Sequence, residues 1–394
     1  MLLSIALIMM VGMLLGWVCK KIHLPGLLGM IVTGIVLGPF ALDVIDGSIL
    51  GISSELRKIA LIIILARAGL SLDIHDLKKV GRPAILMCFV PACFEMFGMV
   101  VLAPRLLGAT VLEAAVVGAV VAAVSPAVIV PKMLKLIEEG RGTEKGIPQM
   151  ILAGASVDDV FVIVMFSVFT GLAQGGKVSL MSFVQVPVSI FLGIGIGIMM
   201  GCAFAWYFKR IHMRDTVKVI ILLCSAFLLV SLEDMAAAWI PFSALVSVMC
   251  IGIALKQKRE AVAIRLSVKF NKLWVAAEIM LFVLVGATVD LKYAAAAGVS
   301  AAVLIVGVLL FRMAGVLCCM IGTRLNARER LFCMFAYMPK ATVQAAIGGL
   351  PLAMGLSCGN MVLTVAVLAI LITAPVGAFL IDLTASTMLL TASP

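Results

Sequence analysis

Two adjacent carboxylates, Asp158 and Asp159, lie in the segment "AGASVDDVFVIV" (residues 153–164), which is otherwise free of charge. A carboxylate in a low-dielectric environment holds a proton more firmly than one in water, while a hard cation such as Na⁺ prefers oxygen ligands. The same oxygens can therefore bind either H⁺ or Na⁺, each excluding the other. Competition for one such site, exposed alternately to the two sides of a membrane, is by itself an exchange mechanism.

The position of the pair within its helix sharpens this expectation. Asp158 follows Gly146, where the apolar run begins, by about 12 residues, so at 1.5 Å per residue it lies roughly 18 Å deep in a hydrocarbon core about 30 Å thick. An ionised carboxylate at this depth costs at least a few kcal/mol. Adjacent helical positions diverge by about 100°, so one carboxylate can face a cavity while the other leans on a neighbouring helix. A pair kept only for stability is disfavoured, because buried ion pairs stabilise poorly and no cation lies nearby in sequence.

The composition predicts an all-α polytopic membrane protein. Hydrophobic residues make up 64% of the 394 residues and charged residues 13%, against about 45–50% and about 25% in soluble domains. A spanning helix needs about 20 mostly apolar residues, and we expect about 13 such helices. The predicted spans are residues 2–19, 24–42, 56–72, 83–103, 110–131, 147–172, 180–207, 217–232, 239–255, 274–289, 298–322, 329–350 and 361–381.

The net charge of +10 does not indicate a nucleic-acid partner, because the basic residues follow the predicted topology. Most Lys and Arg residues fall in every second loop, which by the positive-inside rule places the N-terminus outside and the C-terminus in the cytoplasm. These loops carry Lys20/Lys21, Lys78/Lys79/Arg82, Lys132 to Lys145, Lys209 to Lys218, Lys256 to Lys272 and Arg324/Arg328/Arg330. The ten cysteines are scattered without metal-type spacing, so we interpret them as packing residues.

An odd number of spans permits two inverted six-helix repeats, a plan that many transporters use. Repeat one would cover about residues 1–172 and repeat two about 217–383, joined by a linker helix at about 180–207. Each span then pairs with the span seven positions later, so the run at 110–131 corresponds to the run at 329–350.

These two corresponding runs both carry helix-breaking prolines. Pro126 and Pro131 lie in the first and Pro339 in the second, and a proline inside a helix removes a backbone hydrogen bond. We therefore expect two broken helices, with Pro126, Pro131 and Pro339 at the breaks. Freed carbonyls there would supply cation ligands, together with the hydroxyls of Ser125 or Thr342.

Three further charges lie inside predicted spans near these breaks. Glu95 and Arg312 occupy corresponding positions in the two repeats, and we expect them to pair, or Arg312 also to contact Asp158. Lys340 lies within the second break, where its ammonium would neutralise carbonyl ends of the half-helices. The alternative for Lys340 is a lysine that reaches the membrane interface.

Other classes of protein fit less well. An intramembrane aspartyl protease needs two aspartates that face one another from separate helices, which adjacent residues cannot provide. The sequence has no nucleotide loop, metal cluster or nucleophilic triad, so we expect neither an enzyme nor a cofactor. A sodium-coupled small-solute symporter of related inverted-repeat fold, a K⁺/H⁺ antiporter and a non-transporting scaffold or sensor remain alternatives.

Five motifs together resemble the monovalent cation/proton antiporter superfamily. They are "AVSPAVIVP", "EKGIPQ", "AGASVDDVFVIV", "MPKATVQAAIGG" and "LITAPVGAFLI". Within that superfamily the chain is most similar to sodium/proton exchangers of the NHA type, the solute carrier 9B group, and we interpret it as a bacterial member. The similarity extends over about residues 24–381.

The resemblance implies the NhaA/NapA-like antiporter fold, with the SPAV and PKAT stretches as crossed, unwound helices. It implies that Asp159 is the principal carboxylate for H⁺ and for the transported Na⁺ or Li⁺, with Asp158 as its partner. A mobile core (about 56–172 and 274–383) would move like an elevator against a dimerisation part (about 1–42 and 180–255). The implied assembly is a homodimer in the cell inner (plasma) membrane, with lipids at the dimer interface.

One departure from electrogenic relatives bears on stoichiometry. In those relatives a lysine at the eleventh-span position contacts the aspartate pair, whereas this sequence has Arg312 there, with Glu95 as in the NHA type. An arginine–glutamate bridge would leave the aspartates without a titrating lysine partner. The resemblance therefore favours electroneutral exchange.

Overall fold

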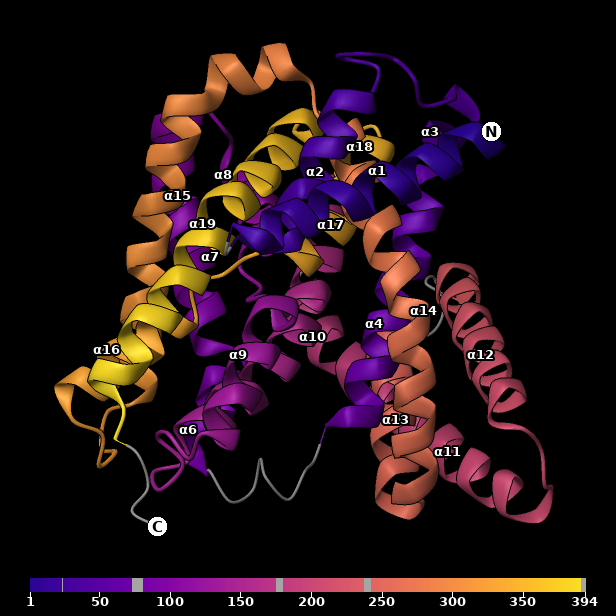
Figure 1. Cartoon of the computed structure of the whole chain (residues 1–394). Helices are drawn as coiled ribbons and strands as arrows, with labels where there is room; N and C mark the ends of the chain where they lie inside the picture. The colour runs from indigo at the N-terminus through magenta and orange to yellow at the C-terminus, as the bar shows by residue number, and fades with distance from the viewer. Residues whose placement is uncertain (23, 73–80, 175–179, 237–241, 391–394) are drawn as a thin grey trace. The chain divides into compact units, whose positions relative to one another are not determined.

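The computed structural model describes the 394-residue chain except residues 23, 73–80, 175–179, 237–241 and 391–394. All the regular elements of the described residues are helices, as the composition predicts (Figure 1). Lys78 and Lys79, two basic residues of a predicted cytoplasmic loop, lie outside the described residues. The helices are α1 (Leu2–Lys21), α2 (Gly26–Leu37), α3 (Gly47–Gly51), α4 (Ser53–Ser71), α6 (Arg82–Met87), α7 (Val90–Leu107), α8 (Val111–Val121), α9 (Pro126–Glu138), α10 (Ile147–Ala173), α11 (Leu180–Arg210), α12 (Asp215–Ala236), α13 (Ala244–Lys258), α14 (Glu260–Ala287), α15 (Leu291–Cys319), α16 (Ala327–Ala336), α17 (Thr342–Ile347), α18 (Leu350–Ala353) and α19 (Gly359–Met388).

Nine helical stretches of the described residues are long and apolar enough to cross a membrane. They are Leu2–Lys21, Arg82–Leu107, Val111–Glu138, Ile147–Ala173, Val188–Arg210, Asp215–Glu233, Glu260–Ala287, Gly298–Cys319 and Gly359–Met388. The chain is therefore a multi-pass membrane protein.

The other four predicted spans correspond to elements that do not meet this standard. α2 has 12 residues and α13 has 15, too short at 1.5 Å per residue for a core of about 30 Å. The run at 329–350 is divided among α16, α17 and α18. α4 has 19 residues but carries four charged side chains, which lowers its hydropathy. The exact number of thirteen crossings thus stays a prediction, as do the repeats and the orientation of the termini.

Contacts divide the chain into two compact units. Unit 1 comprises residues 1–57, 76–175 and 279–394, and unit 2 comprises residues 58–75 and 176–278. The chain passes from one unit to the other within α4 and within α14. In unit 1, α7 packs along α15, while α19, drawn in yellow in Figure 1, packs against α8 and α16.

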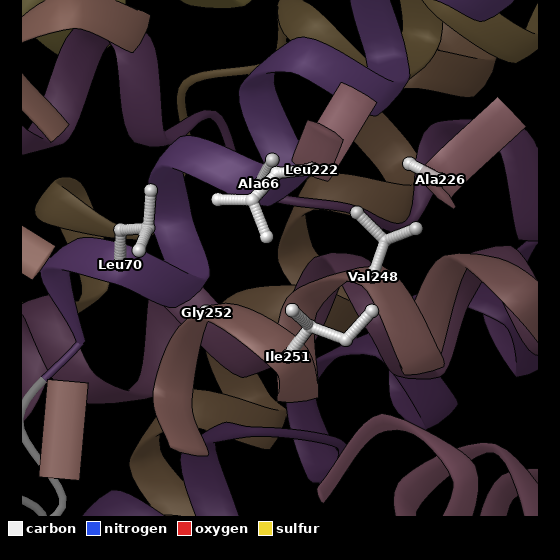
Figure 2. Close-up of a pocket in the computed structure, with 7 residues that line it drawn as sticks. All are labelled: Ala66, Leu70, Leu222, Ala226, Val248, Ile251 and Gly252. Atoms are coloured by element: carbon white, nitrogen blue, oxygen red, sulfur yellow. The ribbon is translucent and has the colours of Figure 1, made fainter. Parts of the chain in front are cut away.

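Unit 2 is built around the packing of α13 against α11 and α12. It contains a small hollow whose lining is entirely apolar, shown in Figure 2. The hollow is lined by Ala66, Leu70, Leu222, Ala226, Val248, Ile251 and Gly252. Because these side chains offer no oxygen ligand, the hollow is not a candidate ion site.

The helices α8 and α16 of unit 1 begin in the same way. The side chain of Thr110 accepts a hydrogen bond from the backbone N–H of Glu113, and the Glu113 carboxylate accepts one from Thr110 N. Asn326 and Glu329 form the same reciprocal capping box at the start of α16. Such a box satisfies two N–H groups that a helix start leaves unpaired. Both helices therefore begin at a capping signal in the sequence, and both are short, with 11 residues in α8 and 10 in α16.

Candidate functional site

The aspartate pair lies in the middle of α10, and its two members have different surroundings. Asp158 is fully buried, and its Oδ2 accepts hydrogen bonds from Val124 N at 2.8 Å and from Arg312 Nη2 at 3.0 Å. Asp159 is also buried, and among the described residues its Oδ1 has no hydrogen-bond partner. Asp158 thus leans on neighbouring elements through Oδ2, while Asp159 makes no hydrogen bond or ion pair among the described residues, the divergence expected of adjacent helical positions.

The first helix break lies between α8 and α9, at residues 122–125. Pro126 is the first residue of α9, where its missing N–H is no loss and its fixed φ suits a helix start. Pro131 lies inside α9, which continues through it to Glu138. The prediction that Pro131 marks the break is therefore wrong: the helix tolerates the single hydrogen bond lost there, and the chain unwinds before Pro126 instead.

The second break follows α16 and spans residues 337–341, with Pro339 in its middle. The two breaks meet directly, because Ser125 N donates to the carbonyl oxygen of Pro339 at 2.8 Å. The backbone N–H of Lys340 donates to Thr373 Oγ1 of α19 at 2.9 Å. The two unwound stretches, residues 122–125 and 337–341, are thus in contact and adjoin the SPAV and PKAT motifs. Most of SPAV itself lies in α9, which begins at Pro126, so the expectation that the whole SPAV stretch is unwound needs correction.

Side chains from other helices donate hydrogen bonds to backbone carbonyl oxygens at the first break. Gln344 Nε2 donates to the carbonyl oxygens of Val121 at 3.0 Å and Ala123 at 2.7 Å. Arg312 Nη1 donates to the carbonyl oxygen of Ala122. Each of these carbonyls is therefore already paired with a protein donor. A carbonyl oxygen has two lone pairs, so these hydrogen bonds anchor the break without excluding a cation, and the expectation that freed carbonyls supply cation ligands stays a prediction.

Arg312 joins several elements around its guanidinium group. Besides Asp158, it donates from Nη1 to Glu95 Oε2 at 2.7 Å and from Nε to the carbonyl oxygen of Tyr337 at 2.7 Å. The guanidinium carbon also lies 5.3 Å from the centroid of the Tyr337 ring. The structure thus contains the expected Glu95–Arg312 pair and also the expected Arg312–Asp158 contact.

Lys340 is fully buried and donates from Nζ to Glu95 Oε2 at 2.5 Å. It does not reach an interface, and its ammonium is held by a carboxylate and not by helix carbonyls, which corrects both sequence-based expectations for it. A carboxylate is the stronger partner because both groups carry full charges. Glu95 therefore pairs with Lys340 and Arg312 together.

Two glycines allow the neighbouring elements to approach the site. A Cβ on Gly154 of α10 would lie 2.2 Å from the Tyr337 hydroxyl oxygen, and one on Gly377 of α19 would lie 2.5 Å from Pro339 Cγ. The Tyr337 hydroxyl donates to the carbonyl oxygen of Met87 at 3.2 Å. These glycines belong to the "AGASVDD" and "LITAPVGAFLI" motifs, so each motif has a packing role beside the breaks.

Buried oxygens without a hydrogen-bond partner are concentrated in this part of the described structure. Buried polar atoms are ordinarily paired, so each such oxygen is an available acceptor or ligand. They are Glu95 Oε1, Ser125 Oγ, Asp158 Oδ1, Asp159 Oδ1, Thr342 Oγ1 and Gln344 Oε1. All the predicted oxygen ligands (Asp159, Asp158, Ser125 and Thr342) keep one. The site therefore offers hard oxygen ligands of the kind that alkali cations prefer.

Sequence reasoning missed Gln344, Tyr337 and the backbone N–H of Val124. A polar residue in an apolar run signals a possible site, and Gln344 in "PKATVQAAIGG" carries that signal. Tyr337 contributes a backbone carbonyl and Val124 a backbone N–H. No residue type could reveal these roles, because they depend on where the backbone unwinds.

Comparisons with known proteins agree with this architecture. Residues 5–386 match the family described as "Sodium/hydrogen exchanger, transmembrane". The chain is 34% identical over 378 residues to sodium/hydrogen exchanger 9B2 of Mus musculus, covering 91% of this chain and 68% of that protein. It is 32% identical over 389 residues to sodium/hydrogen exchanger 9B1 of Homo sapiens, covering 93% and 73%. In fold it is similar to the sodium proton antiporter MjNhaP1 from Methanocaldococcus jannaschii, with a TM-score of 0.86, 18% identity and coverage of 98% and 97%.

The helical fold and the family match define a multi-pass membrane transporter and not an enzyme. The chain belongs to the sodium/hydrogen exchanger family. This confirms the resemblance drawn from the five motifs, including its placement near the solute carrier 9B group.

Proposed function

We propose that the chain exchanges Na⁺ or Li⁺ for H⁺ across the membrane, and that Asp159, with Asp158 beside it, is the site for which the two ions compete. Family membership supports sodium/proton antiport, since its relatives are named sodium/hydrogen exchangers. The observation that carries the site assignment is the contrast within the pair. Oδ1 is unpaired in both acids, but Asp158 Oδ2 is held by Arg312 and by Val124 N, while Asp159 makes no hydrogen bond or ion pair among the described residues. Asp159 is thus the carboxylate left free to exchange a proton for a cation.

The balance of charges supports electroneutral, one-for-one exchange. Two acids, Glu95 and Asp158, and two bases, Arg312 and Lys340, are joined in one buried network of ion pairs. With all four ionised the network is neutral. Asp159 then carries one proton or one monovalent cation and is neutral in either state. A carrier with equal charge in both loaded forms moves no net charge per cycle.

Ser125 and Thr342 are proposed to complete the cation site with their hydroxyl oxygens. Both are buried at the ends of the two breaks, Ser125 directly before α9 and Thr342 as the first residue of α17. Neither hydroxyl oxygen has a hydrogen-bond partner in the structure. Pro126 and Pro339 would maintain the unwound segments that keep these hydroxyls at the site.

The proposed transport cycle is an elevator-type movement in a homodimer, with the N-terminus outside and the C-terminus in the cytoplasm. The mobile part is proposed to be the core, about residues 56–172 and 274–383. The dimerisation part is proposed to be about residues 1–42 and 180–255, with lipids at the dimer interface. The shared capping boxes of α8 and α16 support the inverted repeats, because corresponding helices begin with the same signal. The packing units differ from this division in grouping residues 1–57 with the site.

The proposal is tested in proteoliposomes that contain a pH-sensitive dye. Adding Na⁺ or Li⁺ outside should release protons from acid-loaded vesicles, at a rate unchanged by a clamped membrane potential. The same assay with K⁺ distinguishes a K⁺/H⁺ antiporter. An absence of proton release with all three cations, or proton movement only with an added solute, would contradict the proposal.

A further inference from the structure

The start of α4 carries two buried polar side chains with unused hydrogen-bond donors. Ser53 is the first residue of this helix and Arg57 the fifth, and their exposed fractions are 2% and 3%. Ser53 Oγ and Arg57 Nη1 have no hydrogen-bond partner in the described structure. Because buried polar atoms are ordinarily paired, both groups are available to a ligand.

The two side chains lie on one face of the helix. Residues four apart are neighbours on a helix surface, and the Arg57 side chain runs back over Ser53, since its Nε donates to the Ser53 carbonyl oxygen at 3.2 Å. Gly349, between α17 and α18, bounds the guanidinium group: a Cβ there would lie 2.1 Å from Nη1 and 2.8 Å from Cζ. The guanidinium is therefore held in place between α4 and this backbone, all within unit 1.

The charge of Arg57 is not compensated by a side chain. Arg57 forms no ion pair among the described residues. Glu55, the acid of the first turn, is exposed and lies two positions from both Ser53 and Arg57, so it faces another direction. A buried charge without a partner is costly. An anion bound beside the guanidinium would remove this cost.

The helix start also favours an anion. The first N–H groups of a helix have no acceptor within it, and this end carries a partial positive charge. Helix starts therefore bind anions readily, and α4 is long, with 19 residues. A guanidinium group with a nearby hydroxyl donates several hydrogen bonds in a geometry that suits phosphate oxygens.

We propose that Ser53 and Arg57 form a binding site for a phosphate-type anion at the start of α4. Arg57 Nη1 and the Ser53 hydroxyl donate to its oxygens. Inorganic phosphate and the phosphate group of a lipid headgroup both supply this chemistry. The site is independent of the proposed cation exchange, because neither side chain is bonded to the aspartate pair.

The test measures the melting temperature of the purified protein in an uncharged detergent at one pH. Sodium phosphate is compared with sodium gluconate at equal Na⁺ concentration, and with gluconate plus phosphatidylglycerol. The variants are Arg57→Met and Ser53→Ala. Arg105→Met is the matched control, because it removes the same charge from an exposed arginine in the last turn of α7. Calorimetry gives the Kd of whichever probe, phosphate or phosphatidylglycerol, stabilises the wild type.

The wild type and Arg105→Met should melt at a higher temperature with phosphate or phosphatidylglycerol than in gluconate alone, by an amount that grows with probe concentration. Arg57→Met should lose this increase. In gluconate it should melt no lower than the wild type, because it removes an uncompensated buried charge. Ser53→Ala should raise the Kd by about tenfold, the effect of losing one charge-assisted hydrogen bond.

Stabilisation by inorganic phosphate identifies a free anion as a ligand, and stabilisation by phosphatidylglycerol alone identifies a lipid headgroup; both support the site. A wild type that neither probe stabilises, or an increase that Arg57→Met retains, would overturn it. So would an Arg57→Met variant that melts lower by the same amount under all conditions, since Arg57 would then be purely structural. If Arg57→Met does not fold, Ser53→Ala decides, and an unchanged Kd in that variant refutes the site.

Discussion

Arg312 and Asp158 form a fully buried ion pair, with Nη2 and Oδ2 3.0 Å apart. This ion pair engages only one of the two adjacent carboxylates. Asp158 therefore has a structural role, while Asp159 remains available to bind an ion. Through Oδ2, Asp158 ties α10 to α15 and to the first break, while Asp159 makes no hydrogen bond or ion pair among the described residues. This asymmetry leads to different expectations for the same substitution at the two positions.

Asp159→Asn should abolish cation-dependent proton release yet leave the melting temperature unchanged or higher, because it removes a buried carboxylate with an unpaired oxygen. Asp158→Asn should lower the free energy of unfolding by about 3 kcal/mol, since it leaves Arg312 short of one counter-charge. Thermal melting in detergent and proteoliposome flux measure the two effects. Equal destabilisation by both substitutions would show that the acids are not distinguished in this way.

Glu95→Gln should be strongly destabilising because Glu95 pairs with two cations, Arg312 and Lys340. Leaving buried charges uncompensated costs about 3–5 kcal/mol. Lys340→Met alone should cost less, as Glu95 retains Arg312.

The double variant Glu95→Gln/Lys340→Met should recover part of the Glu95→Gln loss, with a coupling free energy of at least about 1 kcal/mol in a double-mutant cycle. Neutralising Lys340 is the sharper rescue, because Arg312 retains Asp158 as a partner. Additive effects of the two substitutions would rule out a shared ion pair.

Gly377→Ala should destabilise the protein by about 1–3 kcal/mol, the usual cost of overpacking. The new Cβ would lie 2.5 Å from Pro339 Cγ and push the second break away from Ser125. Gly171→Ala on α10 is the matched control, because a Cβ there meets nothing within 4 Å and alanine favours a helix by about 1 kcal/mol. The melting temperatures should move in opposite directions; a shift of the same sign and size would contradict the close contact.

Composition and local signals were enough to predict the helical membrane fold and the two breaks. The prolines placed the unwound stretches to within a few residues, although Pro131 proved to lie inside α9. The charges Glu95, Arg312 and Lys340 were recognisable because each is costly in an apolar run.

The partners of these groups could not be predicted from sequence. Lys340 meets Glu95 across 245 residues of chain, and Gln344 meets Val121 across 223. Such contacts depend on how the breaks cross, which no local pattern encodes. The same holds for the donors to the carbonyls of Ala122 and Ala123, which come from α15 and α17.

The central claim is that one buried acid, Asp159, binds either a proton or an alkali cation. Its most direct test is the apparent Kd for Na⁺ of the purified protein as a function of pH, measured by calorimetry. Below the pH at which the acid releases its proton, the apparent Kd should rise by about tenfold for each unit of falling pH, because one proton is displaced per cation bound. Asp159→Asn should show no measurable Na⁺ binding. An apparent Kd that stays constant over the pH range in which the protein remains folded would contradict the account.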